Sequence, residues 1–407
     1  MNTPEKIYMV GIGGVGMSAL AQLYAAQGIA VCGSDREESP TTHLLRDKGI
    51  DVYIGQFAAQ VPEDAQMLVY SDAVPNENPE RIRGRELGIP ELNYFEALGR
   101  AAEGKRVVAV AGTHGKTTTT AMIGKILIDA GEKPTIIVGS MVGEFGGNFV
   151  AGASDLFVVE ACEYRRHFLV FHPEVLVITN IEFDHTDYFK DLGDVTAAFD
   201  EAKRQAQTVI TSRVYRTEPV PDLLLLGEFN KENARAAKAA VHAIAPHIAD
   251  AQIDRSLAAF AGTWRRFEHK GSMPNNVDVY DDYAHHPTAI AKTIDAARER
   301  FPGRLIVVAF HPHLYSRTRD LFDAFASALA KADFAYILPV YAAREAFDPS
   351  VSNEALAAAV QKRGGHASAV SGIPETAQKL KELGPGTIAI TMGAGDVYKA
   401  GELALDK

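Results

Sequence analysis

Cysteine is scarce in this 407-residue chain, where Cys32 and Cys162 are the only two. Two cysteines so far apart in sequence do not indicate a disulfide framework. Positive charge is also in deficit, with 41 Lys and Arg against 52 Asp and Glu and a net charge of −11. This balance argues against a general binder of nucleic acids or other polyanions. Any phosphate has to be held by local loop amides, helix N-termini and single basic side chains.

Long apolar runs are missing as well, and no stretch suffices to span a bilayer. The residues Met1–Lys6 lack the layout of a signal peptide. We therefore expect a cytoplasmic protein without a membrane partner. The chain is nevertheless 47% hydrophobic, and it is too long for one ordinary domain. Two or three domains are expected.

The chain reads as strand–helix alternation throughout, which predicts successive α/β domains. A small, polar and charged segment at Arg100–Lys105 and a Gly/Pro/Asn-rich stretch at Lys270–Asn276 give boundaries for three domains, 1–103, 104–270 and 271–407. Short apolar runs predict buried strands at Ile7–Val10, Ile29–Cys32, Met67–Tyr70, Val107–Val110, Leu156–Val159, Val175–Ile178, Val277–Tyr280, Leu305–Phe310, Phe334–Leu338 and Thr387–Ile390.

A glycine-rich loop follows the first predicted strand and opens a helix. Its sequence is Gly11-Ile12-Gly13-Gly14-Val15-Gly16, and Asp35 closes the second strand nineteen residues later. The G-x-G-x-x-G spacing lets the backbone approach a pyrophosphate, and an acid at this distance binds a ribose in dinucleotide-binding domains. The loop alone is compatible with a tight turn without a ligand, with a nicotinamide dehydrogenase, or with another nucleotide ligand.

A second glycine loop follows the strand that ends at Val110. It reads Gly112-Thr113-His114-Gly115-Lys116-Thr117-Thr118 and precedes a helical run. Loop amides of this kind cradle phosphates, the Lys neutralises β/γ charge, and a Thr hydroxyl reaches magnesium. Val110 stands where the standard P-loop has its first glycine. A dehydrogenase has no use for this loop, so the two loops indicate one nucleotide-bearing substrate plus ATP.

Acidic and imidazole side chains follow two further predicted strands. Glu160 and Glu163 come after Leu156–Val159, while Asp184 and His185 come after the strand that ends at Ile178. Two adjacent parallel strands with these ends would bring a carboxylate and an imidazole together beside the ATP phosphates. Hard oxygen ligands there suit Mg²⁺, which binds through one or two protein groups plus phosphate.

Five motifs in order resemble those of the Mur ligases, over nearly the whole chain. They are Gly112–Thr118, Asn180–His185, Gly227–Asn233, Asp281–Thr288 and Pro312–Thr318, with Val10–Ser18 resembling the opening loop. The resemblance implies a Rossmann-like N-terminal domain for a UDP-sugar, a central P-loop ATPase-like domain for ATP, and a Rossmann-like C-terminal domain for an amino acid. It also implies ATP-dependent formation of an amide between L-alanine and the lactyl carboxylate of UDP-N-acetylmuramate through an acyl phosphate, in peptidoglycan precursor synthesis.

The same resemblance implies roles for individual residues. The expected catalytic residues are Lys116, Glu160, His185 and His285. Beyond the loop Gly112, Thr113, His114, Gly115, Lys116, Thr117 and Thr118, the expected ATP contacts are Asn230, Asn233, Arg266 and Asp282. The expected UDP-sugar contacts are Gly11, Gly13, Gly14, Val15, Gly16, Asp35 and Ser71. The expected amino-acid contacts are His285, His313 and Arg317, and the expected Mg²⁺ ligands are Thr117, Glu160 and His185.

Two residues depart from the family pattern in the last motif region. Leu314 stands where an arginine is usual, and His311 replaces a glutamine, so amino-acid recognition is less defined than ATP chemistry. A recycling ligase that attaches a whole murein tripeptide to the same UDP-sugar is the nearest alternative, although Pro312–Thr318 favours the alanine reaction. A non-catalytic UDP-sugar sensor is disfavoured because Lys116, Glu160 and His185 are all present. We expect a monomer or weak homodimer that binds no nucleic acid.

Overall fold

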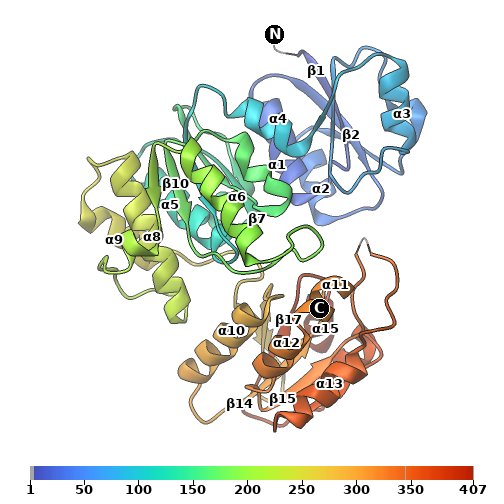
Figure 1. The fold of residues 1–407 in the computed structure, drawn as a ribbon, viewed down its shortest axis with the longest axis vertical. Coiled ribbons are helices and arrows are strands. Elements are labelled where there is room, and N and C mark those ends of the chain that lie inside the picture. Colours follow the sequence, from blue (N-terminus) through green and yellow to red (C-terminus); the bar gives the residue numbers. More distant parts are fainter. Residues whose placement is uncertain (1–3, 344, 407) are drawn as a thin grey trace.

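The computed structural model describes residues 4–343 and 345–406. Residues 1–3, on which the expectation about a signal peptide partly rests, lie outside this range. Three sheets form three successive bodies along the chain, with the central body between the other two (Figure 1). The architecture is three-domain α/β, as the sequence predicts.

The N-terminal sheet is entirely parallel, in the strand order β3-β2-β1-β4-β5. Its middle strand contains the run Ile7–Val10, which is fully buried because helices cover both faces of a parallel sheet. The elements are β1 (Lys6–Val10), α1 (Val15–Ala26), β2 (Ala30–Asp35), α2 (Pro40–Asp47), β3 (Asp51–Ile54), η1 (Ala58–Gln60), β4 (Met67–Tyr70), α3 (Pro79–Glu86), β5 (Glu91–Asn93) and α4 (Tyr94–Ala101).

The central sheet has the order β11-β10-β6-β9-β7-β8 and is parallel except for the pair β7–β8. Its core includes Val108, Val110 and Val177 packed against helix α5 and helix α8. The elements are β6 (Arg106–Ala111), α5 (Lys116–Asp129), β7 (Thr135–Val142), η2 (Gly143–Phe145), β8 (Gly147–Val150), β9 (Leu156–Glu160), η3 (Tyr164–Val170), β10 (Val175–Ile178), α6 (Leu192–Gln205), β11 (Thr208–Ile210), α7 (Ser212–Tyr215), α8 (Glu228–Ile244) and α9 (Asp250–Ala259).

The C-terminal sheet has the order β12-β13-β17-β14-β15-β16, with one antiparallel pair at the β12 edge. Its core is centred on Phe310 and Phe325, both fully buried. The elements are β12 (Glu268–Ser272), β13 (Asp278–Asp282), α10 (Pro287–Arg300), β14 (Leu305–Phe310), α11 (Tyr315–Asp320), α12 (Phe322–Leu329), β15 (Phe334–Ile337), α13 (Asn353–Lys362), β16 (Ala367–Ala369), α14 (Ile373–Lys381), β17 (Thr387–Met392) and α15 (Tyr398–Ala404).

All ten apolar runs that predict strands overlap strands of the structure, and only Ile29, Val277 and Leu338 at their ends fall outside them. The long strand β7 has no counterpart among them, because Gly139 and Ser140 interrupt its apolar run and its register with β8 shifts between Ile137 and Val142. The Gly/Pro/Asn-rich stretch at Lys270–Asn276 forms the end of β12 and the turn into β13. The third sheet therefore begins at Glu268, slightly before the predicted boundary.

The N-terminal and central bodies are joined by buried polar contacts from Asn148 on β8 to helix α1. The Asn148 amide donates to the carbonyl of Val15 at 2.5 Å and to the Ser18 hydroxyl at 3.1 Å, and its oxygen accepts from Gln22 at 3.3 Å. Asn148 is fully buried. Because α1 follows the first glycine loop, this contact fixes that loop relative to the central sheet.

No helix within residues 4–343 and 345–406 combines the length and the apolar character needed to cross a membrane.

We expect Asn148→Ala to destabilise the chain by about 1–3 kcal/mol, because the Val15 carbonyl and the Gln22 amide would lose their buried partner. Urea unfolding of the full chain measures the loss. Asn76→Ala is the matched control, since Asn76 is exposed and such changes stay within about 0.5 kcal/mol. Equal stability of the two variants would contradict the role of Asn148.

Candidate functional site

The second glycine loop connects β6 to α5, and two of its glycines are required by geometry. Gly112 has φ 131°, and a Cβ there would lie 2.1 Å from the Thr179 hydroxyl. Gly115 has φ 81°, and a Cβ there would lie 2.2 Å from the Asn233 side-chain oxygen. Positive φ strains any residue with a side chain. The two glycines therefore allow the loop to adopt this backbone conformation at the start of α5. Backbone amides and the helix dipole would stabilise a bound phosphate there.

Lys116, the first residue of α5, folds back over this loop. Its ammonium donates to the Gly112 carbonyl at 2.5 Å and to the Thr113 carbonyl at 3.3 Å, and it pairs with Glu163 at 3.0 Å. Burial alone would favour the neutral amine, but the Glu163 carboxylate outweighs it and raises the pKa of Lys116. The loop thus carries a fixed positive charge next to its amides.

Glu163 is the partner that sequence reasoning did not assign to Lys116. It is 2% exposed, and its carboxylate also lies 3.6 Å from His185 Nε2. Burial opposes its ionisation, yet the Lys116 ammonium and the nearby His185 imidazole lower the pKa of Glu163 to about 2. Its place three residues after the end of β9 marks it, like Glu160, as a candidate near the phosphate loop.

Strands β9 and β10 are not adjacent, which corrects the sequence-based expectation. Strand β6 lies between them, so the residues that follow each strand flank the phosphate loop from opposite sides. The polar groups still converge, because parallel strands end at one edge of the sheet. His185 contacts Glu163, as noted, while Glu160 contacts Thr117.

Glu160 and Thr117 form the oxygen-rich part of the site. The Thr117 hydroxyl donates to Glu160 Oε1 at 3.1 Å, and the Gly139 amide donates to Glu160 Oε2 at 2.8 Å. His185 Nδ1 is buried without a hydrogen-bond partner among the described residues. A hydroxyl, a carboxylate and an unpartnered imidazole nitrogen beside a phosphate loop fit a Mg²⁺ that takes its remaining ligands from phosphate and water.

The predicted adenine contacts lie where helix α8 begins, as expected. Asn230 donates to the Leu226 carbonyl at 2.7 Å, and Asn233 donates to the Asn230 oxygen at 3.3 Å. Both amides are buried, and Asn233 packs against Gly115 of the phosphate loop. The segment and the loop therefore form one continuous wall.

Arg266, just before the third sheet, and Asp282, at the end of β13, lie against this wall. Arg266 donates to the Thr117 hydroxyl at 3.3 Å. The Asp282 carboxylate accepts from the backbone amides of Ala284 at 2.7 Å and Phe267 at 2.8 Å. Burial raises the pKa of Asp282 to about 6, although the charge of Arg266 opposes the shift. Asp282 is thus mostly ionised at neutral pH and presents a carboxylate to the cavity.

His285 follows β13 and points its unprotonated nitrogen away from the backbone. Its Nδ1 lies 2.9 Å from the Tyr283 carbonyl, which favours the proton on Nδ1 and a lone pair on Nε2. Burial, with Arg317 second, keeps the pKa of His285 well below its usual range. The ring is therefore neutral at neutral pH, and its Nε2 is available as a hydrogen-bond acceptor.

Arg317 is buried and makes an ion pair across two domains. Its Nε donates to Asp184 at 2.8 Å, and its Nη1 lies 3.3 Å from His313 Nδ1. Asp320, three residues further along the chain, accepts from Arg319 at 3.0 Å instead. Arg317 and His313 are thus brought together, next to His285, whose ring centre is 6.5 Å from that of His313.

Leu314 is also buried, 2% exposed, and has φ 71° immediately before helix α11. The arginine usual at this position would need space that the packed side chain of Leu314 fills.

One cavity collects most of the predicted ATP and catalytic residues from the central and C-terminal bodies. Its lining includes Thr113, His114, Gly115, Lys116, Thr117, Thr118, Glu160, His185, Asn230, Asn233, Arg266, Asp282 and His285. Gly112, His313 and Arg317 are not among the lining residues, although Gly112 and Arg317 bond to groups close to it. Most residues expected to bind ATP therefore meet in one place with His285, which is expected to act on the amino acid.

A second cavity lies at the first glycine loop. Of the predicted UDP-sugar contacts, Gly11, Gly13, Gly14, Asp35 and Ser71 line it, whereas Val15 and Gly16 lie in the first turn of α1. Asp35 accepts from the Gly13 amide at 2.8 Å. A Cβ on Gly16 would lie 2.6 Å from the Tyr94 ring, so this glycine serves close packing against α4.

Comparison with known proteins gives matches along the whole chain. Residues 6–106 match the model of the Mur ligase family catalytic domain, residues 110–209 the Mur ligase middle domain, and residues 265–395 the Mur ligase glutamate ligase domain. The UDP-N-acetylmuramate–L-alanine ligase of Desulfitobacterium hafniense is 40% identical over 446 residues, covering 98% of this chain and 99% of that protein.

Solved structures of proteins named as ligases of this kind have a similar fold. The UDP-N-acetylmuramate–alanine ligase of Thermotoga maritima superimposes with a TM-score of 0.82 at 29% identity and covers 98% of each chain. A murein peptide ligase of Psychrobacter arcticus shares the fold, with a TM-score of 0.70 at 21% identity, covering 99% of this chain and 98% of that one. Three family models that together span most of the chain, and a relative 40% identical over nearly all of it, place this protein in the Mur ligase family.

Proposed function

We propose that this chain is an ATP-dependent ligase that joins L-alanine to the lactyl carboxylate of UDP-N-acetylmuramate in peptidoglycan precursor synthesis. The observation that carries the proposal is the single cavity lined by the phosphate loop and by His285 of the C-terminal domain. The similarity to UDP-N-acetylmuramate–L-alanine ligases over nearly the full length supports these substrates. Residues 1–103 would bind the UDP-sugar, 104–270 ATP and 271–407 the amino acid.

ATP phosphates would bind the amides of Gly112–Thr118 at the start of α5. Lys116 would exchange its Glu163 partner for the β/γ-phosphates and neutralise charge on the transferring phosphoryl group. Thr117, Glu160 and His185 would hold Mg²⁺, which supplies further charge neutralisation when bound. The pyrophosphate of the UDP-sugar would occupy the first glycine loop at the start of α1, beside Asp35 and Ser71.

In the reaction, a lactyl carboxylate oxygen attacks the γ-phosphorus and forms an acyl phosphate, releasing ADP. The amino group of alanine then attacks the acyl carbon, and the tetrahedral intermediate expels phosphate to leave the amide. His285 is neutral, and its Nε2 lone pair would accept a hydrogen bond from the alanine amino group and orient it for attack. Arg317 and His313 would orient the alanine carboxylate.

Contacts to ATP from two domains would couple nucleotide binding to closure of the cavity. Asn230 and Asn233 offer amide groups to the adenine, and Asp282 offers a carboxylate to the ribose from the C-terminal side. Arg266 already reaches the Thr117 hydroxyl beside the phosphates. Closure of this kind excludes water, which would otherwise hydrolyse the acyl phosphate.

A phosphate-release assay with UDP-N-acetylmuramate and ATP tests the proposal. L-Alanine, glycine, L-serine and the murein tripeptide are supplied separately. We expect release that depends on the UDP-sugar and is fastest with L-alanine. Preference for the tripeptide would identify the recycling reaction instead, and no release with any acceptor would overturn the proposed ligase activity.

Lys116→Ala should lower kcat by about 10² or more, because an electrostatic clamp on the phosphoryl group is lost. Affinity for UDP-N-acetylmuramate should stay within about twofold, since its loop lies on a different sheet. Steady-state kinetics and calorimetry measure the two effects. Lys125→Ala, on the same helix but paired with Asp129 and Glu144, is the control. Loss of UDP-sugar binding in Lys116→Ala would contradict the assignment of the two loops.

Arg317→Ala should raise the KM for the amino acid far more than that for ATP or the UDP-sugar. Leaving a carboxylate in a closed site without its cation costs about 2–5 kcal/mol, which is roughly 30-fold or more in KM. Arg319→Ala is the matched control on the same helix, because Arg319 is half exposed and pairs with Asp320 and Asp348. An unchanged KM for the amino acid in Arg317→Ala would contradict the proposed role of Arg317 in binding the amino-acid carboxylate.

A further inference from the structure

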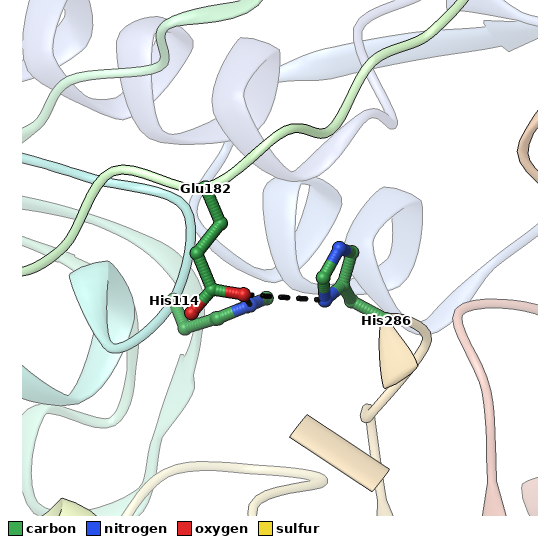
Figure 2. Close-up of side chains that lie close together, drawn as sticks. All are labelled: His114, Glu182 and His286. Carbon is green, nitrogen blue, oxygen red and sulfur yellow. Dashed lines mark ion pairs between the residues drawn. The ribbon is translucent and has the colours of Figure 1, made fainter. Parts of the chain in front are cut away.

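Three side chains meet at the junction of the central and C-terminal domains, outside the set assigned to Mg²⁺. They are His114 of the phosphate loop, Glu182 after β10, and His286 before α10 (Figure 2). Their ligand atoms all lie within 4.8 Å of one another. The proposed reaction assigns no task to Glu182 or His286.

The distances match a tetrahedral metal site. Glu182 Oε2 lies 3.6 Å from His114 Nε2 and 3.9 Å from His286 Nδ1. Ligands at about 2.0–2.1 Å from a tetrahedral Zn²⁺ are about 3.4 Å apart, so both separations from Glu182 are within about half an ångström of that geometry, and the two imidazoles lie within 4.8 Å of each other. Both separations are too long for hydrogen bonds. The three side chains therefore face one another without forming hydrogen bonds to one another.

His114 supplies an independent sign of a missing ligand. Its Nε2 is buried and has no hydrogen-bond partner among the described residues. The backbone around it is fixed, since its amide donates to Asn180 at 2.9 Å and its carbonyl accepts from Thr179 at 2.5 Å. A buried nitrogen aimed at a carboxylate and a second imidazole is the arrangement that a metal ion satisfies.

The other two side chains are oriented as metal ligands usually are. His286 Nε2 lies 3.3 Å from the Phe183 carbonyl, which places the proton there and the lone pair on Nδ1. That lone pair now accepts a long hydrogen bond, 3.3 Å, from the Thr288 amide, which a metal would replace. The Thr288 hydroxyl donates to Glu182 Oε2 at 2.6 Å and orients the carboxylate.

The protonation states agree with this geometry. Burial, with the neighbouring His114 second, lowers the pKa of His286, so its ring is neutral at neutral pH. The nearby imidazole of His114 lowers the pKa of Glu182 to about 2, against the effect of burial. A neutral imidazole and a carboxylate are the forms that bind a metal.

We propose that His114, Glu182 and His286 form a Zn²⁺ site distinct from the Mg²⁺ site. Two imidazoles and one carboxylate suit Zn²⁺ rather than Mg²⁺, which prefers oxygen. Three protein ligands leave a fourth position open, and His114 and His286 both line the ATP cavity. Because His286 belongs to the C-terminal domain and the other two ligands to the central domain, bound Zn²⁺ holds the two domains together.

The test is a Zn²⁺ titration of the full chain, without nucleotide and with Mg²⁺ in millimolar excess, followed with a competing fluorescent chelator. Glu182→Gln keeps an acceptor for Thr288, and His286→Asn keeps a good helix cap. Each should weaken Zn²⁺ binding by roughly 10–100-fold or more, because even outer groups of metal sites have effects of that size.

Two control variants separate this site from others. Glu160→Gln removes a predicted Mg²⁺ ligand, and His247→Asn breaks a histidine–carboxylate pair on the surface, 2.7 Å from Glu132. Both should bind Zn²⁺ as the unaltered chain does. Loss of binding in Glu160→Gln with retention in Glu182→Gln would overturn the proposal, as would equal binding by all variants, which indicates an adventitious ion only.

An anomalous difference map from crystals of the unaltered chain with Zn²⁺ decides the matter even if a variant does not fold. We expect a peak at about 2.0–2.2 Å from His114 Nε2, Glu182 Oε2 and His286 Nδ1. A peak elsewhere, or none, overturns the site. These readouts report metal binding and not turnover, so they are independent of the proposed ligase activity.

Discussion

The buried ion pair between Asp184 and Arg317 is the interaction on which the composite cavity depends. Asp184 follows the central sheet and Arg317 lies on α11 of the C-terminal domain, and both are about 95% buried. Removing one partner would leave an isolated charge in a nearly dry interface, at a cost of about 3–5 kcal/mol. The pair therefore favours an arrangement in which the phosphate loop faces His285. The contacts Thr288–Glu182 and Arg266–Thr117 support the same arrangement from either side.

Within this arrangement, each body contributes one kind of chemistry. The N-terminal sheet offers a glycine loop and Asp35, and the central sheet offers the phosphate loop with Lys116 and Glu160. The C-terminal body brings His285. In the N-terminal and central bodies, the candidate ligand-binding loops lie at the carboxyl ends of parallel strands, where helix N-termini and loop amides come together. The first body is connected to the second by the Asn148 contacts to α1 and by an apolar core that the two bodies share.

Much of this was predictable from the sequence, because runs such as Ile7–Val10 and spacings such as Gly112–Thr118 encode strands and loops locally. The order of the strands within each sheet was not predictable, because no local sequence pattern specifies next to which strand a crossover connection returns. Placing β9 beside β10 was wrong for that reason. Ion pairs between residues far apart in the sequence could not be predicted either. Nothing near Arg317 in the sequence indicates Asp184, 133 positions away, and nothing near Lys116 distinguishes Glu163 from Glu160 as its partner.

The Lys116–Glu163 pair has a consequence for nucleotide exchange. An ammonium that already holds a carboxylate gains less from an arriving phosphate than a bare one does, because binding trades one anion for another. If Lys116 binds ATP as proposed, part of the intrinsic affinity for ATP would thereby be lost. Glu163 would then be in place to pair with Lys116 again as a phosphate leaves, which would lower the barrier to releasing ADP from a buried loop. A carboxylate placed as a stand-in for phosphate would keep the loop preformed between turnovers and hasten its emptying.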